Sequence, residues 1–292
     1  IRTYIVANLS VGTRGKECSI ELLTQIVEAI LYRLKTGCQS EPRRWRFLPV
    51  SQFVREKKLS WQGVYYHFTK WVKDGSWTKV WLNLLSTHKD KIDLSCVQLD
   101  GSHTICKRAG EAVGYQTRKK APTTNTLFLA DRQGQLLACS TCQAGNHHDL
   151  FDIENQFEQL CSILTQAGIE HKGLFLNADA GFDSEAFRKQ CQRKEIQANI
   201  APNTRNTTPT SPLEKQKHNQ QWTDKEDHNA NYHYFDELLY SYRTVIEQAN
   251  AWMDSFKVLL IRFEKKAPNW TAFLYMAFSI RFLRKIQPLN KY

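Results

Sequence analysis

The stretch VQLDGSHT, residues 97–104, is the most informative for the fold of this chain. In it a short predicted strand ends on an aspartate. Val97 and Leu99 are typical of a short buried strand. Asp100 then follows, and Gly101–His103 favours a turn over a continuing strand. Since Asp-Gly is a common turn dipeptide, one interpretation of Asp100 is a turn cap. The other interpretation is a metal ligand whose partners lie further along the chain.

The segments after this stretch alternate between strands and helices. Their boundaries follow from apolar periodicity and from turn residues such as Gln133-Gly134, which joins the second and third strands as a hairpin. Strands are predicted at 97–100, 124–131, 136–141, 174–179 and 197–201, and helices at 149–167, 183–193 and 235–264. Residues 202–232 are polar and are predicted to form a long surface excursion. The order predicts a mixed α/β fold with an antiparallel beginning.

The first part of the chain is predicted to be entirely helical. Helices are expected at 20–36, 51–58 and 61–73, and a fourth follows Ser76. Two short helices, the second amphipathic with polar and basic residues on its outer face, resemble a helix-turn-helix module. In such a module the second helix enters the major groove of DNA. The alternative is a small bundle whose outer face is only solvated. The outward residues of helix 61–73 are Gln62, Tyr66, Thr69, Lys70 and Lys73.

Composition narrows the class of partner. The 292 residues carry 40 Lys+Arg and 29 Asp+Glu, a formal net charge of +11, which favours a polyanion such as nucleic acid. The eight cysteines are scattered, which is typical of a reducing compartment. Cys139 and Cys142 precede His147 and His148 as in half a zinc site, but no second pair follows at the required spacing. The apolar stretch 273–283 is too short to span a bilayer.

Three acidic residues stand out as possible metal ligands. Asp100 and Asp179 each follow a predicted strand, and Glu247 lies on the long C-terminal helix beside its apolar stripe. Strand ends and a packed helix can bring these carboxylates to one edge of a sheet. Mg²⁺ prefers such oxygen ligands, and paired divalent ions promote in-line displacement at phosphorus. Each acid alone is also compatible with a turn or a solvated surface.

Several motifs together resemble DDE transposases of the bacterial insertion-sequence-five type. The resemblance extends over nearly the whole chain, including LYRLKTGC and SWQGVYYHFTKW near the N-terminus. It rests on LDGSHT (99–104), GEAVGYQTRKK (110–120), GNHHDL (145–150), NADAGFDS (177–184) and YSYRTVIEQANAWMDSFKVLLIRFE (240–264). It implies an N-terminal helical DNA-binding domain at 1–94 and an RNase H-like catalytic domain at 95–292, with the polar excursion inserted in the latter.

The resemblance also implies the chemistry. Asp100, Asp179 and Glu247 become a catalytic triad that binds two Mg²⁺ or Mn²⁺ ions. Tyr240 and Arg243 fit the Tyr-x-x-Arg-x-x-x-Glu pattern that ends at Glu247. The implied partners are the double-stranded DNA of transposon ends and target, with a homodimer or larger assembly on DNA and no membrane. The implied location is the bacterial cytoplasm at the nucleoid.

Other residues are expected to support DNA binding. Lys107, Arg118, Lys119 and Lys120 lie between the first two predicted strands and are candidates for phosphate contact, or else form a solvated loop. Asp254 occupies a place where the related pattern has a lysine. If 235–264 is one helix, Lys257 or Arg262 can replace that lysine, since both lie within about 80° of Glu247 on the helical wheel.

Two interpretations remain open. Asp149 is expected to be the N-cap of helix 149–167, with a fourth metal ligand as the alternative. For function, the alternatives to a transposase are a divalent-metal nuclease that cuts without joining, and an inactive DNA-binding derivative of a transposase.

Overall fold

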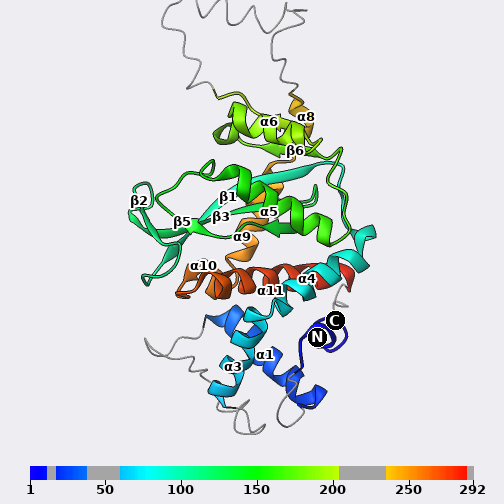
Figure 1. Cartoon of the computed structure of the whole chain (residues 1–292), viewed down its shortest axis with the longest axis vertical. Coiled ribbons are helices and arrows are strands. Elements are labelled where there is room, and N and C mark those ends of the chain that lie inside the picture. The colour runs from blue at the N-terminus through cyan, green and yellow to red at the C-terminus, as the bar shows by residue number, and fades with distance from the viewer. Residues whose placement is uncertain (12–17, 38–59, 204–234, 288–292) are drawn as a thin grey trace, which may run out of the picture.

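The computed structural model describes residues 1–11, 18–37, 60–203 and 235–287, which form a central sheet with helices above and below it (Figure 1). The expected helix 51–58 and the excursion from residue 204 onward lie outside these residues. The strands are β1 (Val97–Cys106), β2 (Gly114–Gln116), β3 (Ala121–Ala130), β4 (Leu136–Cys139), β5 (Gln143–Ala144), β6 (Phe175–Ala178), β7 (Gln197–Ile200) and β8 (Ile261–Arg262).

The sheet is mixed, and β1 is its central strand. The order is β2-β3-β1-β6-β7, and β4 and β5 also pair with β3. β3 runs antiparallel to β1, whereas β6 runs parallel to β1 and β7 parallel to β6. The predicted α/β class with an antiparallel beginning is therefore confirmed. The Gln133-Gly134 hairpin is also confirmed, with Gly134 in the left-handed region at φ 77°.

The prediction that the first strand ends at Asp100 is wrong. β1 continues through Gly101 to Cys106, because β3 pairs with it from Gln98 to Ile105. The backbone hydrogen bonds of this ladder outweigh the local turn preference of Asp-Gly.

The prediction of one long helix at 235–264 is also wrong. Three helices replace it, α8 (Glu237–Ser241), α9 (Thr244–Met253) and α10 (Lys257–Leu260), before the chain enters β8. Phe256 is extended, with φ −91° and ψ 110°, and β8 pairs with β1 through Ile105↔Ile261 and Cys106↔Arg262. α9 and α10 both bury apolar residues, so the apolar pattern did not reveal the break between them.

The remaining helices are α1 (Ile20–Thr36), α3 (Trp61–Lys73), α4 (Ser76–Thr87), α5 (Ile153–Gln166), α6 (Glu185–Arg193) and α11 (Ala267–Ile286), with 3₁₀ turns at Val6–Asn8, Lys89–Lys91 and Ala180–Phe182. Ser19 and Ser60 cap α1 and α3 through their hydroxyls, and Gly37 ends α1 at φ 64°. No described helix is long and apolar enough to cross a membrane.

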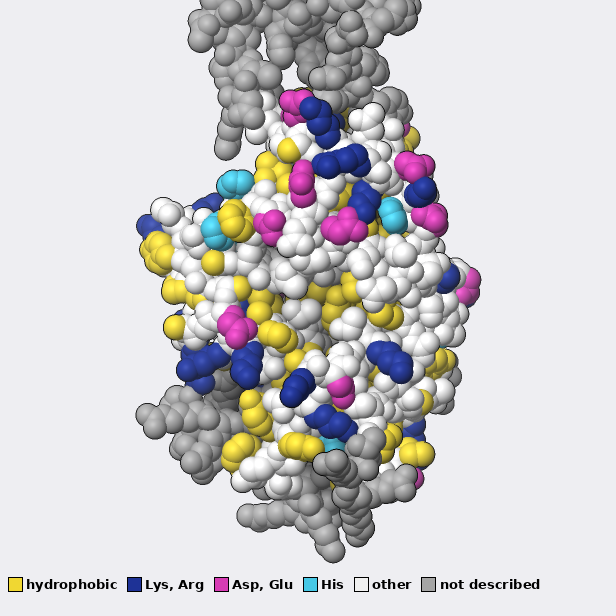
Figure 2. Space-filling view, in the orientation of Figure 1, with side chains coloured by type: hydrophobic (Ala, Val, Ile, Leu, Met, Phe, Trp, Pro, Cys, Tyr) yellow, Lys and Arg dark blue, Asp and Glu magenta, His cyan; other side chains and the backbone are white. Residues whose placement is uncertain are grey.

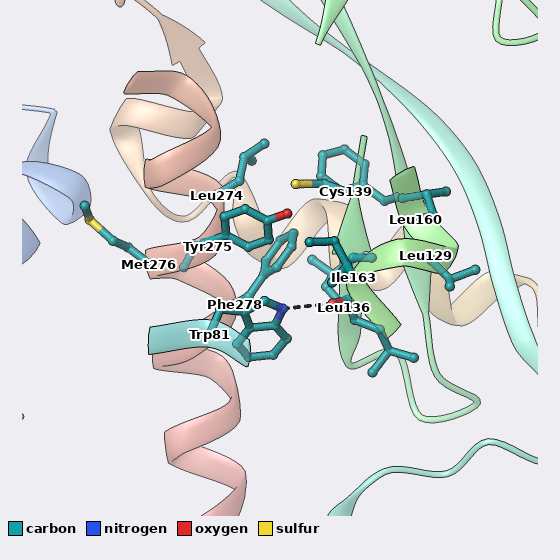
Figure 3. Close-up of a cluster of buried hydrophobic side chains, with 14 of the residues drawn as sticks. Trp81, Leu129, Leu136, Cys139, Leu160, Ile163, Leu274, Tyr275, Met276 and Phe278 are labelled. Atoms are coloured by element: carbon teal, nitrogen blue, oxygen red, sulfur yellow. Dashed lines mark hydrogen bonds between the residues drawn. The ribbon is translucent and has the colours of Figure 1, made fainter. Parts of the chain in front are cut away.

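α11 lies between the N-terminal helices and the sheet (Figure 1). Figure 3 shows how it makes this contact: Tyr275 and Phe278 face β4, and the Trp81 indole of α4 donates a 2.8 Å hydrogen bond to the Leu137 carbonyl. One apolar cluster thereby includes residues from the N-terminal helices, α11 and the sheet. The domain boundary at 94/95 stays a prediction.

Arg262 fastens β8 to the rest of the sheet. Its side chain is only 1% exposed, and it donates hydrogen bonds to Thr124 Oγ1 at 2.9 Å, to the Glu111 carbonyl at 2.8 Å and to the Glu264 carbonyl at 2.9 Å. Removal of the guanidinium leaves three acceptors without their donor.

We therefore expect Arg262→Met to lower the free energy of unfolding by at least about 3 kcal/mol in urea denaturation. The exposed Arg284 in the last turn of α11 provides a matched control, and Arg284→Met should stay within about 0.5 kcal/mol of the parent. Equal stability of both variants would contradict the role given to Arg262.

Candidate active site

The candidate site lies where β1 is left without a neighbouring strand. On one edge, β6 pairs with Val97–Leu99 and β8 pairs with Ile105 and Cys106. Within the described residues, no strand pairs with 100–104 on that edge. This uncovered segment of β1 begins at Asp100, so the carboxylate that the sequence singles out stands at its start.

Asp100 is partly buried beneath α9. The Asn250 amide Nδ2 donates to Asp100 Oδ2 at 3.3 Å, which places α9 over this carboxylate. The pKa of Asp100 is raised to about 7. Burial is the main cause, the Arg243 charge opposes it, and the charges of Asp179 and Asp149 add to it. A positive charge added near this carboxylate would therefore be strongly favourable.

Asp179 directly follows β6, as predicted. Its Oδ1 accepts a 2.9 Å hydrogen bond from the Gly181 amide, so the carboxylate also caps the 3₁₀ turn Ala180–Phe182. β6 ends beside Leu99, which brings Asp179 to the start of the uncovered segment. The expectation that two strand-associated aspartates share one edge of the sheet is met in the geometry.

Glu247 lies on α9 and pairs with Arg243 one turn earlier, at 2.6 Å. Burial lowers the pKa of Arg243, but the charges of Tyr240, Glu247, Asp100 and Asp179 outweigh it and raise the pKa overall. The guanidinium therefore acts as the positive counter-charge within this acidic group.

An open cavity of about 610 Å³ connects these residues. Polar and charged side chains line most of it, including all three predicted acids. Its walls are Asp100, Gly101, His103, Tyr115, Gln116, Thr117, Arg118, Gly145, Asn146, His147, His148, Asp149, Asp179, Arg243 and Glu247. The cavity is open to solvent and mostly polar, in contrast to a closed apolar pocket for a small molecule.

Asp149 is in the cavity wall, and its expected role as the N-cap of α5 is wrong. The N-cap position belongs to Asp152, whose side chain makes no capping bond. Asp149 Oδ1 instead accepts a 2.6 Å hydrogen bond from Asn125 Nδ2 on β3. Asp149 also lies close against Gly101 of β1, and a glycine inside a strand commonly marks such a close approach.

The structure places the basic residues between the first two predicted strands in two separate regions. Arg118 lines the cavity, and the Lys119 ammonium donates to the carbonyl of His103. Lys120 is exposed beside them. Lys107 follows the other end of β1, roughly 20 Å along the strand from Asp100 at about 3.3 Å per residue.

Lys257 and Arg262 do not lie beside Glu247. The helix break after Met253 removes the helical-wheel relation on which that expectation depended. Lys257 packs against Gly37 and lines a separate small cavity, while Arg262 is buried in the sheet.

The outward face expected for α3 is present in part. Gln62, Tyr66 and Lys73 are exposed, with Tyr66 63% exposed, but Lys70 donates to the Ser10 carbonyl at 3.2 Å. Figure 2 shows basic, acidic and apolar side chains interspersed on the face that it draws. The positive charge on that face is therefore distributed and does not form a single stripe.

The donor chemistry of the cavity fits a hard divalent cation. The negative charges of Asp179 and Asp149 both act on the Asp100 carboxylate, and the buried Asn250 Oδ1 has no hydrogen-bond partner among the described residues. In the described part of the chain, however, no three His, Cys, Asp or Glu side chains are close enough to hold a metal as they stand. Cys139 is buried with its pKa raised to about 12 by burial, which gives no support to the half zinc site.

Comparison with protein families agrees with this geometry. Residues 91–282 match the family model described as "Transposase DDE domain", and residues 10–81 match one described as a transposase of the IS4/5 family. The chain belongs to the DDE transposases of the IS4/5 type. No curated protein matches this transposase significantly.

Among solved structures, this transposase is similar at a distance to Mos1 transposase. The Mos1 paired-end complex with the left transposon end is 11% identical, with a TM-score of 0.29, and the match covers 96% of this chain and 82% of that one. A pre-cleavage Mos1 transpososome is 12% identical, with the same coverage and TM-score. These likenesses are too remote to define the fold.

The raised pKa of Asp100 gives a prediction for the metal-free protein. The unfolded carboxyl has a pKa of 3.8 and the folded one about 7, so the folded state binds more protons between these values. The free energy of unfolding should therefore fall as the pH rises from about 4 to above 7. In EDTA at pH 8, Asp100→Asn should be more stable than the parent by about 2–4 kcal/mol in urea denaturation.

This advantage should disappear at pH 4, where both side chains are neutral. Asp152→Asn, a matched change at an exposed aspartate, should show no such pH dependence. A parent protein as stable at pH 8 as at pH 5 would contradict the assignment of Asp100 as a buried, repelled carboxylate.

Proposed function

We propose that this transposase binds the terminal inverted repeats of an insertion sequence and catalyses metal-dependent strand cleavage and strand transfer. The observation that carries this proposal is the cavity at the uncovered segment of β1, which Asp100, Asp179 and Glu247 all line. These three residues would hold Mg²⁺ or Mn²⁺, two ions per site. The ions, when bound, activate an attacking oxygen and stabilise the leaving one.

The side chains around the acids suit a phosphodiester substrate. Arg243 lies in the cavity beside Glu247 and can bind a non-bridging phosphate oxygen once Glu247 turns towards a cation. Tyr240 lies three residues before Arg243, where it can guide the same strand. Arg118, Lys119 and Lys120 provide positive charge at the rim for the flanking backbone.

We also assign the catalytic domain, residues 95–292, to the RNase H-like class. Support comes from three antiparallel strands, β1, β3 and β4, followed by β6 and β7 parallel to β1. Residues 1–94 would form the DNA-binding domain that recognises the element ends through α3. Lys107 and Lys257 would contact DNA outside the cavity. We also propose that the protein acts on DNA as a homodimer in the bacterial cytoplasm.

The test is an assay with purified protein, labelled ends of its own element, a supercoiled target and Mg²⁺ or Mn²⁺. We expect cation-dependent nicking at the ends and joining to the target. Asp179→Ala should reduce both by at least about 10³-fold while it still binds the ends, because cation binding is lost and DNA binding is not.

Asp90→Ala, at an exposed aspartate outside the cavity, should retain full activity. Nicking without joining would identify a nuclease instead. End binding with no chemistry in either metal would identify an inactive DNA-binding derivative.

DNA recognition by α3 can be tested separately with Lys73→Ala, since Lys73 is exposed on this helix. Loss of one phosphate contact should weaken end binding several-fold at physiological salt and reduce the slope of log affinity against log salt by about one. A filter-binding or anisotropy titration at several salt concentrations measures both.

Lys79→Ala is the matched control, because Lys79 is an exposed lysine of α4. Its affinity and salt slope should equal those of the parent. Equal losses in the two variants would indicate general electrostatic attraction, and no loss in either would exclude α3 as a contact.

A further inference from the structure

Residue 101 is a glycine for a steric reason. Its φ is not in the left-handed region, so its backbone does not require glycine. A Cβ built at Gly101 would lie 2.1 Å from Asp149 Oδ1 and 2.5 Å from its Cγ, far inside contact distance. Any other residue here would push the Asp149 carboxylate away from β1.

Asp149 is held in this place by the adjacent strand. Asn125 is 0% exposed on β3, and its Nδ2 donates the 2.6 Å hydrogen bond to Asp149 Oδ1. The loop before Asp149 is tied to β3 as well, since the Gly145 amide donates to the Thr123 carbonyl at 3.0 Å. The carboxylate is therefore preorganised against the strand.

Asp149 reaches β1 from the face of the sheet opposite to the one that α9 covers. Successive residues of a strand point to opposite faces, so Asp100 faces α9 and Gly101 faces the α5 side. The two faces meet at the uncovered edge of β1, where Asp149 and Asp100 both line the cavity. The Asp149 charge reaches Asp100 there, since it raises the pKa of that carboxyl.

The Asn125 bond alone does not account for an aspartate at 149. The amide donor needs only an acceptor oxygen, and an asparagine would supply one without adding negative charge to an acidic cavity. Meanwhile Asn125 Oδ1 is buried without a hydrogen-bond partner among the described residues. The negative charge at 149 costs stability in the absence of a cation and is useful in its presence.

We propose that Asp149 is a fourth carboxylate of the cation site, brought to the uncovered edge of β1 across Gly101 and held there by Asn125. This inference rests on the proposed function. The Asp149 carboxylate would reach the site from the face of the sheet opposite α9 and would strengthen its affinity for a divalent cation.

The experiment measures Mn²⁺ binding to the EDTA-treated full chain without DNA, by electron paramagnetic resonance titration of free Mn²⁺. Asp149→Asn keeps the acceptor for Asn125 and removes the charge. We expect its Mn²⁺ dissociation constant to rise at least about tenfold. Gly101→Ala leaves the charge but displaces the carboxylate, and it should weaken Mn²⁺ binding in the same direction.

Asp152→Asn is the matched control. Asp152 is three residues away, exposed, and at φ 50°, a conformation that asparagine accepts. Its Mn²⁺ affinity should equal that of the parent. An unchanged dissociation constant in Asp149→Asn, even with a lower melting temperature, would overturn the proposal and reduce Asp149 to a loop anchor. If Asp149→Asn does not fold, the Gly101→Ala titration decides the question by the same criterion.

Failure of this inference is distinguishable from failure of the proposed function. A parent protein that binds Mn²⁺ and nicks element ends, with Asp149→Asn unchanged in Mn²⁺ affinity, refutes only the role of Asp149. A parent protein that neither binds Mn²⁺ at a site sensitive to Asp100→Asn nor nicks DNA refutes the proposed function itself.

Discussion

The organisation of this transposase depends on the unequal lengths of β1 and its neighbours. β1 is ten residues long, whereas β6 is four and β8 is two, so these two strands cover only its ends on one edge. On the other edge, the ladder with β3 pairs β1 continuously through the uncovered part. Backbone and side chains at 100–104 are therefore accessible without any loss of order, which is what a preorganised site needs.

Two elements use this opening from opposite faces of the sheet. α9 brings Glu247 and Arg243 to one side, and the loop before α5 brings Asp149 to the other. Like charges gather there at a cost in stability, and Arg243 offsets part of it. A site of this kind trades stability for affinity towards a cation and a polyanion, as functional sites often do.

Local patterns in the sequence were sufficient for the α/β class with its antiparallel beginning, for the hairpin and for the place of Asp179 directly after a strand. They failed where pairing between distant segments decides the structure. Nothing near Asp100 shows that β3 will hold Gly101 in a strand, and nothing in the apolar stripe of 235–264 shows that Arg262 will leave the helix for a buried place beside Thr124. Asp149 was misassigned for the same reason, since its partner Asn125 lies 24 residues away.

The strand that closes the far end of the uncovered segment also reaches the N-terminal helices. Arg262 of β8 holds the Glu264 carbonyl, and the Glu264 carboxylate forms a buried ion pair with Arg33 of α1. α10, which precedes β8, packs on α1 as well, with the Cβ of Lys257 close against Gly37. A buried charge pair is sensitive to small displacements, because separation leaves each charge desolvated and alone. The N-terminal helices, which are proposed to bind DNA, and the edge of the sheet that is proposed to cut it are therefore connected through β8 as well as through α11.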